Sequence, residues 1–178
     1  MKATGIVRRI DDLGRIVIPK EIRSTMHIRE SDPLEIYTGN SGEIIFKKYS
    51  ALGEIPTFAE KFAEILQKEI LCPVIITDRD SVIAVSGASK SEFLGKKISQ
   101  EAEIIIEKRT QFVQSDNSKT VSPIEGVENY AKIISPILTN GDISGSVIVL
   151  NSESKISGSI CAKITQLTAK FISAIIEN

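Results

Sequence analysis

Residues 11–23 read Asp-Asp-Leu-Gly-Arg-Ile-Val-Ile-Pro-Lys-Glu-Ile-Arg and place a turn, a strand and a helix in immediate succession. The aspartates and Gly14 favour a tight turn, because aspartate tolerates turn geometry and glycine accepts a positive φ. Three β-branched residues at 16–18 predict a short, buried strand. Pro19 cannot continue a central strand but suits the first turn of a helix, which we predict over 20–27.

Two arginines flank this predicted strand–helix corner, Arg15 before the strand and Arg23 in the helix. Cationic side chains on a rigid corner indicate a surface that meets polyanions. Residues 1–30 hold seven Lys or Arg and four Asp or Glu, a net charge of +3, whereas residues 51–178 hold 13 and 16, a net charge of −3. Only the N-terminal part is therefore a candidate nucleic-acid surface, although composition alone is also compatible with an ordinary solvated surface.

The first 50 residues form a unit too small to bury a full core. In addition to the strand at 16–18, strands are predicted over 4–10, 34–38 and 43–48, with a turn cluster at 38–42. Chains below roughly 40–60 residues often need a partner to fold, and short strands such as these leave their edges unpaired. We therefore expect this unit to be an obligate dimer.

The same unit resembles the AbrB-type swapped-hairpin family of DNA-binding domains. The resemblance is carried by Lys-Ala-Thr-Gly-Ile-Val-Arg-Arg-Ile at 2–10, by residues 12–23, by Leu-Glu-Ile-Tyr at 34–37 and by Ile-Ile-Phe-Lys-Lys-Tyr at 44–49. It implies a mainly-β fold in which two chains interleave their hairpins into one dimer, within a domain of residues 1–50.

By the same resemblance, the family's DNA-contacting basic positions correspond to Lys2, Arg8, Arg9, Arg15 and Arg23. Arginine suits this role because its planar fork bridges phosphates or reaches guanine O6 and N7, and a two-fold dimer presents each arginine twice. The family often has a second arginine directly after Arg23, where this chain has Ser24, so that contact is not carried over. An alternative role for Arg9 and Arg29 is an ion pair with a nearby acid, namely Glu21, Glu30 or Asp32.

The rest of the chain reads as a linker at 51–56 and an α+β domain at 57–178. Helices are predicted over 55–71, 99–109 and 160–176, and strands over 74–77, 82–86, 130–138 and 143–150. Asn140-Gly141 predicts a hairpin turn, Pro136 an edge or bulge, and the Ser89 to Glu92 spacing a capping box. This order fits an antiparallel sheet with helices packed against it, and it resembles the GAF-like fold.

Apolar residues recur at helical spacing along two of these helices. They stand at Ile55, Phe58, Phe62, Ile65 and Leu66 in the first helix, and at Ile164, Leu167, Phe171 and Ile175 in the last. One stripe must cover the sheet, and the near-heptad steps of the first predict that part of it packs on another chain. We therefore expect a second association surface and a homotetramer. The alternative is that both stripes are buried inside one protomer.

The sequence contains no pattern that supports catalysis, a cofactor or a metal site. The single histidine, His27, lies in the N-terminal unit, so Ser-His-Asp and Cys-His arrangements are excluded from the larger domain. No Cys/His cluster has zinc spacing, and no Walker or dinucleotide glycine pattern occurs. Residues 86–90 could form an anion-binding nest, but a loop with a helix cap explains them better, and Asp78 and Asp80 are better explained as turn residues.

Two cysteines, Cys72 and Cys161, are too few for a disulfide framework, and we expect both to be buried free thiols in a reducing cytoplasm. No apolar run approaches the length of a membrane span, and the N-terminus lacks a signal-peptide pattern. These features favour a cytoplasmic protein.

Over its whole length the chain resembles a family of sporulation regulators in which an AbrB-like domain precedes a GAF-like domain. That resemblance implies a nucleoid-associated regulator of late sporulation genes in the forespore, which activates or represses by promoter. The implied partners are double-stranded DNA and further copies of the chain, and a small-molecule ligand of the GAF-like domain is left open. Alternatives are an antitoxin-like binding module, an AbrB-type transition-state regulator not tied to sporulation, and a GAF-type enzyme, which the missing His, Cys and metal constellation disfavours.

Overall fold

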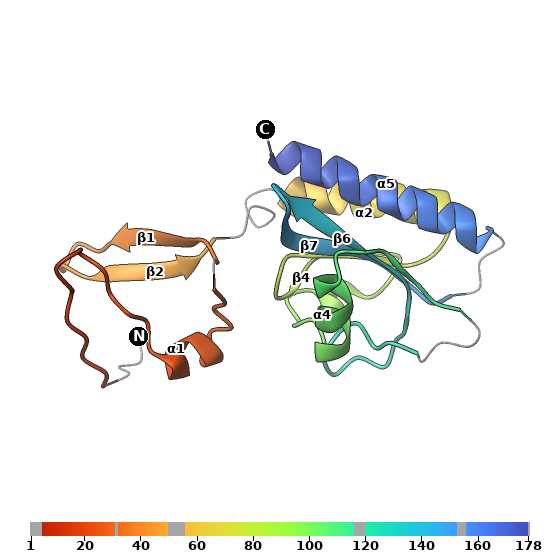
Figure 1. Ribbon diagram of the computed structural model, residues 1–178. Coiled ribbons are helices and arrows are strands. Elements are labelled where there is room, and N and C mark those ends of the chain that lie inside the picture. Colours follow the sequence, from red (N-terminus) through yellow and green to blue (C-terminus); the bar gives the residue numbers. More distant parts are fainter. Residues whose placement is uncertain (1–4, 31, 50–55, 116–119, 153–155, 178) are drawn as a thin grey trace. The chain divides into compact units, whose positions relative to one another are not determined.

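The chain divides into two compact units, Met1–Tyr49 and Ser50–Asn178. The structure is a computed structural model that describes residues 5–30, 32–49, 56–115, 120–152 and 156–177 (Figure 1).

The first unit contains one short helix and one hairpin. Helix α1 spans Lys20–Thr25, and strands β1, Leu34–Thr38, and β2, Ile44–Lys48, pair antiparallel. Ile36 lies opposite Phe46, and their neighbours on the same face are Leu34, Thr38, Ile44 and Lys48. Gly42, at φ 80°, turns the chain between the two strands, in the left-handed conformation that glycine adopts without strain.

Two of the predicted strands do not form in this unit. Residues 5–10 and 15–18 join no ladder, and Thr4 lies outside the described residues. The prediction that 16–18 is a buried strand is therefore wrong for the single chain, because Val17 is 71% exposed. The physical reason is that a strand needs a neighbour to accept its hydrogen bonds, and the single chain offers none here.

The first unit also lacks a core of its own. Among its described residues only Pro19 is buried. Twelve large apolar side chains are exposed instead: Ile6, Val7, Ile10, Leu13, Ile16, Val17, Met26, Ile36, Tyr37, Ile44, Phe46 and Tyr49. A unit with this much exposed apolar surface cannot offset the conformational entropy of folding with its own contacts.

The second unit is built on a five-stranded antiparallel sheet in the order β4-β3-β7-β6-β5. The strands are β3, Val74–Thr77; β4, Val82–Ser86; β5, Phe112–Val113; β6, Ala131–Thr139; and β7, Asp142–Leu150. The helices are α2, Pro56–Ile70; α3, Lys90–Phe93; α4, Gln100–Glu107; and α5, Gly158–Ile176.

Both faces of this sheet are covered. Helices α2 and α5 lie side by side on one face (Figure 1). Their buried side chains, small and large, pack there on alternate residues of the strands. Helix α4 lies on the opposite face, where Phe93, Ala102 and Ile106 pack against Ile75, Ile134 and Ile148. The result is a three-layer α+β domain with two apolar cores.

Local sequence signals predicted much of this unit. The hairpin turn between β6 and β7 is confirmed, with Asn140 at φ 51° and Gly141 at φ 85°, as a type I′ turn requires. Pro136 lies where β6 no longer pairs with β5, so the predicted local edge is confirmed. The predicted capping box at Ser89 is wrong, because its hydroxyl pairs with the hydroxyl of Ser91 and not with a backbone N–H.

Helix α5 corrects the expectation that no apolar run approaches the length of a membrane span. It is long and apolar enough, by length and composition alone, to cross a membrane, because Lys163 and Lys170 are its only charged residues. The face that carries Cys161, Thr165 and Ile172 is nevertheless buried on the sheet. This packing is typical of a core helix in a globular domain.

Candidate nucleic-acid interface

The turn at 11–15 is held together by one carboxylate. Oδ1 of Asp11 accepts hydrogen bonds from the backbone N–H groups of Leu13, at 3.0 Å, and Arg15, at 2.7 Å. The backbone N–H of Gly14 donates to the carbonyl of Asp11 at 3.0 Å, with Gly14 at φ 76°. The predicted turn chemistry is thus present, and it fixes where the backbone of Arg15 leaves the turn.

The same carboxylate also orients the Arg15 side chain. Nε of Arg15 donates to Oδ2 of Asp11 at 2.9 Å, while the Arg15 side chain remains 69% exposed. The pKa of the Asp11 carboxyl is lowered, chiefly by the hydrogen bond from the Arg15 backbone. Since Asp11 engages only Nε, the outer two nitrogens of the guanidinium can meet a phosphate or a base edge.

Arg23 is placed by the single full turn of α1. Its backbone N–H donates to the Pro19 carbonyl at 2.9 Å, and its own carbonyl accepts from the backbone N–H of Ile28 at 2.8 Å. The side chains of Arg8, Arg9 and Arg23 are exposed, and none of the three has an ion pair to another described residue. Of the five predicted DNA-contacting residues, Lys2 lies outside the described residues.

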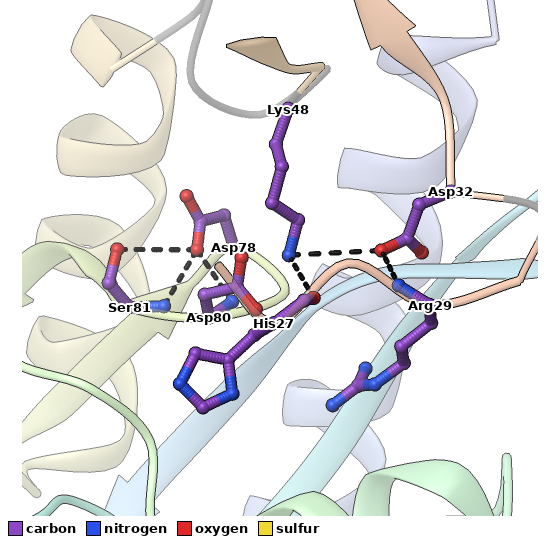
Figure 2. Close-up of polar contacts among 7 residues, drawn as sticks. All are labelled: His27, Arg29, Asp32, Lys48, Asp78, Asp80 and Ser81. Carbon is purple, nitrogen blue, oxygen red and sulfur yellow. Dashed lines mark hydrogen bonds and ion pairs between the residues drawn. The ribbon is translucent and has the colours of Figure 1, made fainter. Parts of the chain in front are cut away.

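A second polar cluster anchors the hairpin to the segment after α1. Nζ of Lys48 donates to the carbonyl of His27 at 2.9 Å and lies 3.8 Å from Oδ2 of Asp32, whose side chain is 2% exposed (Figure 2). The same Asp32 oxygen accepts from the backbone N–H of Arg29 at 2.8 Å. This hydrogen bond comes from the Arg29 backbone, so it does not test the alternative of a side-chain ion pair for Arg29. This cluster fixes β2 relative to α1, and so relative to Arg23.

The sequence reasoning missed two residues of this arrangement, Asp11 as the partner of Arg15 and Asp32 as the anchor of Lys48. Asp11 stands four residues before Arg15 across a glycine turn, and that spacing is a signal that could have found it. Asp32 and Lys48 are 16 positions apart, and only the hairpin register brings them together.

In the second unit, the residues that the sequence offered as candidate sites have structural roles. Oδ1 of Asp78 accepts from the backbone N–H groups of Asp80 and Ser81, which confirms the turn (Figure 2). Cys72 and Cys161 are free and buried as predicted, and burial raises the pKa of the Cys161 thiol. Within the described part of the chain, no group of three or more His, Cys, Asp or Glu side chains could hold a metal ion.

Removal of the Asp11 charge should loosen the turn that presents Arg15. We expect Asp11→Asn to lower the thermal midpoint of the protein at neutral pH, because three hydrogen bonds lose a charged acceptor. The folded-state pKa of Asp11 is depressed, so its stabilising effect is present above the ordinary value of 3.8 and is lost as the pH falls below it. Midpoints of the wild type and Asp11→Asn should therefore converge below that pH. Asp12→Asn is the matched control, and an equal loss in both variants would contradict this role.

Each of the two units matches a known protein family. Residues 54–177 match the family described as Stage V sporulation protein T C-terminal, transcription factor. Residues 7–51 match the family described as Antidote-toxin recognition MazE, bacterial antitoxin.

Two proteins of Bacillus subtilis (strain 168) are similar in sequence. Stage V sporulation protein T is 44% identical over 179 residues, which cover 99% of this chain and 99% of that protein. The transition state regulatory protein AbrB is 59% identical over 49 residues, which cover 28% of this chain and 50% of that protein. The N-terminal unit is therefore an AbrB-like domain.

The second unit shares its fold with solved GAF domains. The blue-light absorbing form of the Thermosynechococcus elongatus PixJ GAF-domain aligns with 73% of this chain and 89% of its own, at a TM-score of 0.53 and 16% identity. That likeness shows the fold alone, and it confirms the predicted GAF-like α+β architecture. Because a relative matches along almost the entire length and the C-terminal family covers most of the second unit, this chain belongs to the stage V sporulation protein T family.

Proposed function

We propose that this protein is a dimeric, DNA-binding transcription regulator that reads duplex DNA through the arginines of its N-terminal unit. The observation that carries the proposal is a set of four exposed arginines: Arg15 on a turn and Arg23 on a helix, whose backbones are fixed by hydrogen bonds, and Arg8 and Arg9 in the segment before the turn. Lys2 completes the set by resemblance. Fixed cations with exposed guanidinium groups bind phosphates and base edges with little loss of side-chain entropy.

The dimer follows from the incomplete core of the N-terminal unit. Residues 5–18 carry six exposed large apolar side chains and have no ladder partner in the described chain. A second copy that interleaved its own 5–18 segment and hairpin would supply both the missing strand neighbours and the missing apolar contacts. It would also double every arginine about a two-fold axis, which matches pseudo-symmetric operators.

The experiment that tests the proposal is selection of bound duplexes from a random DNA library by the purified full-length protein. We expect enrichment of a pseudo-palindromic site and a binding constant that falls steeply with salt, because phosphate neutralisation releases counterions. Recovery of no sequence preference, together with salt-independent binding, would contradict DNA recognition by this surface.

Two other functions are less well supported. The antitoxin-like alternative has the family match over residues 7–51 in its favour, but the chain continues into a full GAF-like domain, and the relative that spans it is a sporulation protein. The GAF-type enzyme has no supporting observation, since Cys72 and Cys161 are buried in the core under α2 and α5. We infer a regulator located with the DNA in the cytoplasm, acting on late sporulation genes in the forespore as activator or repressor by promoter.

We further propose that α2 and α5 join two DNA-binding dimers into a tetramer. The sides of these helices that face the sheet carry small side chains, including Ala59, Ala63, Ala162 and Ala169, together with the larger Leu66, Ile70 and Ile172. Six further large apolar side chains of the same helices are exposed, namely Phe58, Ile65, Ile160, Leu167, Phe171 and Ile175. The alternative that both stripes are used inside one protomer does not account for these exposed side chains, and large apolar patches of this kind mark association surfaces.

An acidic substitution in this patch should divide the tetramer into dimers. We expect Phe171→Glu to halve the mass of the full-length protein in light scattering while its fold persists, because a charge cannot be buried unpaired in an apolar interface. Ile104→Glu is the matched control, since Ile104 is similarly exposed on α4 at the opposite face of the sheet. An unchanged mass in Phe171→Glu would reject this interface.

Loss of residues 56–178 should likewise leave a dimer that recognises the same site but binds tandem sites more weakly.

A further inference from the structure

A pocket of about 270 Å³ lies at the edge of the sheet in the second unit. Its walls come from three segments: the residues just before β5, the stretch of β6 that β5 leaves uncovered, and one face of α5. The side chains that decide its chemistry are Arg109, Gln111, Pro136, Gln166 and Lys170.

The pocket is held in shape by hydrogen bonds across its walls. The side-chain amide of Gln111 donates to Oγ of Ser135 at 2.7 Å and to the carbonyl of Ala162 at 2.8 Å, which ties the segment before β5 to both β6 and α5. The hydroxyl of Ser173 donates to the carbonyl of Leu138, which ties α5 to β6 a second time. A site with walls fixed in this way is largely pre-formed, as small-molecule sites usually are.

The lining is positively charged. Arg109 and Lys170 are the charged residues of the lining, which contains no carboxylate, and Gln166 adds an amide donor. Lys170 has no ion pair to another described residue. Arg109 lies 3.7 Å from Asp142, but both side chains are more than half exposed, so a ligand anion can displace this weak pair.

The edge of β6 disfavours a peptide as the occupant. Strand β5 pairs only with Ile133 and Ile134, so the edge from Ser135 onward is open. An added strand would need a donor there, yet Pro136 has no N–H, which is a common device against strand addition. A compact molecule with its own negative charge fits the volume and the donors better than an extended backbone does.

We propose that this pocket binds a small molecule bearing a carboxylate or phosphate group, held between Arg109 and Lys170. The guanidinium and ammonium groups neutralise the anion, and Gln166 donates a further hydrogen bond. Its regulatory consequence rests on the proposed function: Lys170 neighbours Phe171 on the helix that carries the exposed apolar patch, so an anion that neutralises Lys170 would change the charge beside this patch and bias tetramer assembly.

Calorimetric titration of the full-length protein with succinate and with inorganic phosphate tests the site, with glycerol as the neutral comparator. We expect saturable binding of at least one anion, one per protomer, with Kd below about 10 mM and no heat from glycerol. Arg109→Gln and Lys170→Gln should each weaken binding by about fivefold or more, whereas Lys163→Gln, on the same helix outside the pocket, should bind as the wild type does.

These measurements distinguish a carboxylate ligand from a phosphate ligand, and the pocket proposal from the proposed DNA binding. Binding of succinate alone indicates a carboxylate ligand, and binding of phosphate alone indicates a phosphoester. Absence of binding for both anions, or an equal loss in Lys163→Gln, would overturn the site. Lys170→Arg keeps the charge and should retain binding, so an equal loss in folded Lys170→Arg and Lys170→Gln would show that the charge does not hold the anion and would also overturn the proposal. DNA selection by the wild type is measured independently, so its failure would be distinguishable from a failure of this pocket.

Discussion

Residues 1–50 alone should form a dimer for which no folded monomer exists. Only one residue is buried in the described part of this unit, and 12 large apolar side chains are exposed, so folding and association must be one step. A tenfold rise in protein concentration adds about 1.4 kcal/mol to dimer stability, which should raise the thermal midpoint of a dimer of this size by about 6 °C. Melting curves over a wide range of protein concentration measure this directly.

A charge placed in the shared core should abolish that fold. We expect Val17→Asp to leave residues 1–50 unfolded and monomeric in ultracentrifugation, although Val17 is 71% exposed in the single chain. Ser24→Asp is the control, since Ser24 is exposed on α1 and its charge stays in water. A Val17→Asp protein that melts like the wild type, or a wild-type midpoint independent of concentration, would show that the unit is complete as a monomer.

Arg15→Ala and Arg23→Ala should produce the largest losses of DNA affinity. Each arginine that contacts a base edge in a bidentate manner contributes about 1–3 kcal/mol, which corresponds to roughly 5- to 150-fold in Kd. An arginine that binds phosphate should instead, when replaced by alanine, reduce the slope of log affinity against log salt concentration by about 1. Fluorescence anisotropy with the selected duplex over a salt series separates these two cases.

Two further variants sharpen the assignment. Arg15→Lys keeps the charge but removes the planar fork. Compared with Arg15→Ala, it should therefore recover affinity that comes from phosphate contacts but not affinity that comes from base contacts. Lys108→Ala removes an exposed cation from the second unit and should leave affinity unchanged. If the variants Arg15→Ala and Arg23→Ala stay folded and bind as tightly as the wild type, these arginines do not form the interface.

Features set by neighbouring residues could be predicted from the sequence. The Asp-Asp-Leu-Gly turn and the Asn140-Gly141 hairpin form as expected, because their backbone angles are decided within a few residues. The long helices α2 and α5 also form where their apolar spacing repeats over many residues. The family resemblance is confirmed over almost the entire chain.

Features set by distant residues could not be predicted. Residues 5–10 and 16–18 have the composition of strands, but a strand exists only beside a neighbour. Strand β5 has two residues, which is too short for any periodicity, and it exists because β6 lies next to it. The face of α5 that meets the sheet carries Ala162, Ala169 and Ile172, and not Leu167 and Phe171 of the predicted stripe, because the fit to the strands beneath decides which face is buried.

The central claim is that the DNA-binding unit is assembled from two chains. Isotope-filtered NMR on a dimer of residues 1–50, refolded from equal amounts of labelled and unlabelled chain, tests it most directly. We predict intermolecular contacts between the methyl groups of Val7, Ile16 and Val17 in one chain and the Phe46 ring in the other, because these exposed groups have no partners within the described part of one chain that would bury them. Filtered spectra without such contacts, in a sample with the mass of a single chain, would contradict the claim.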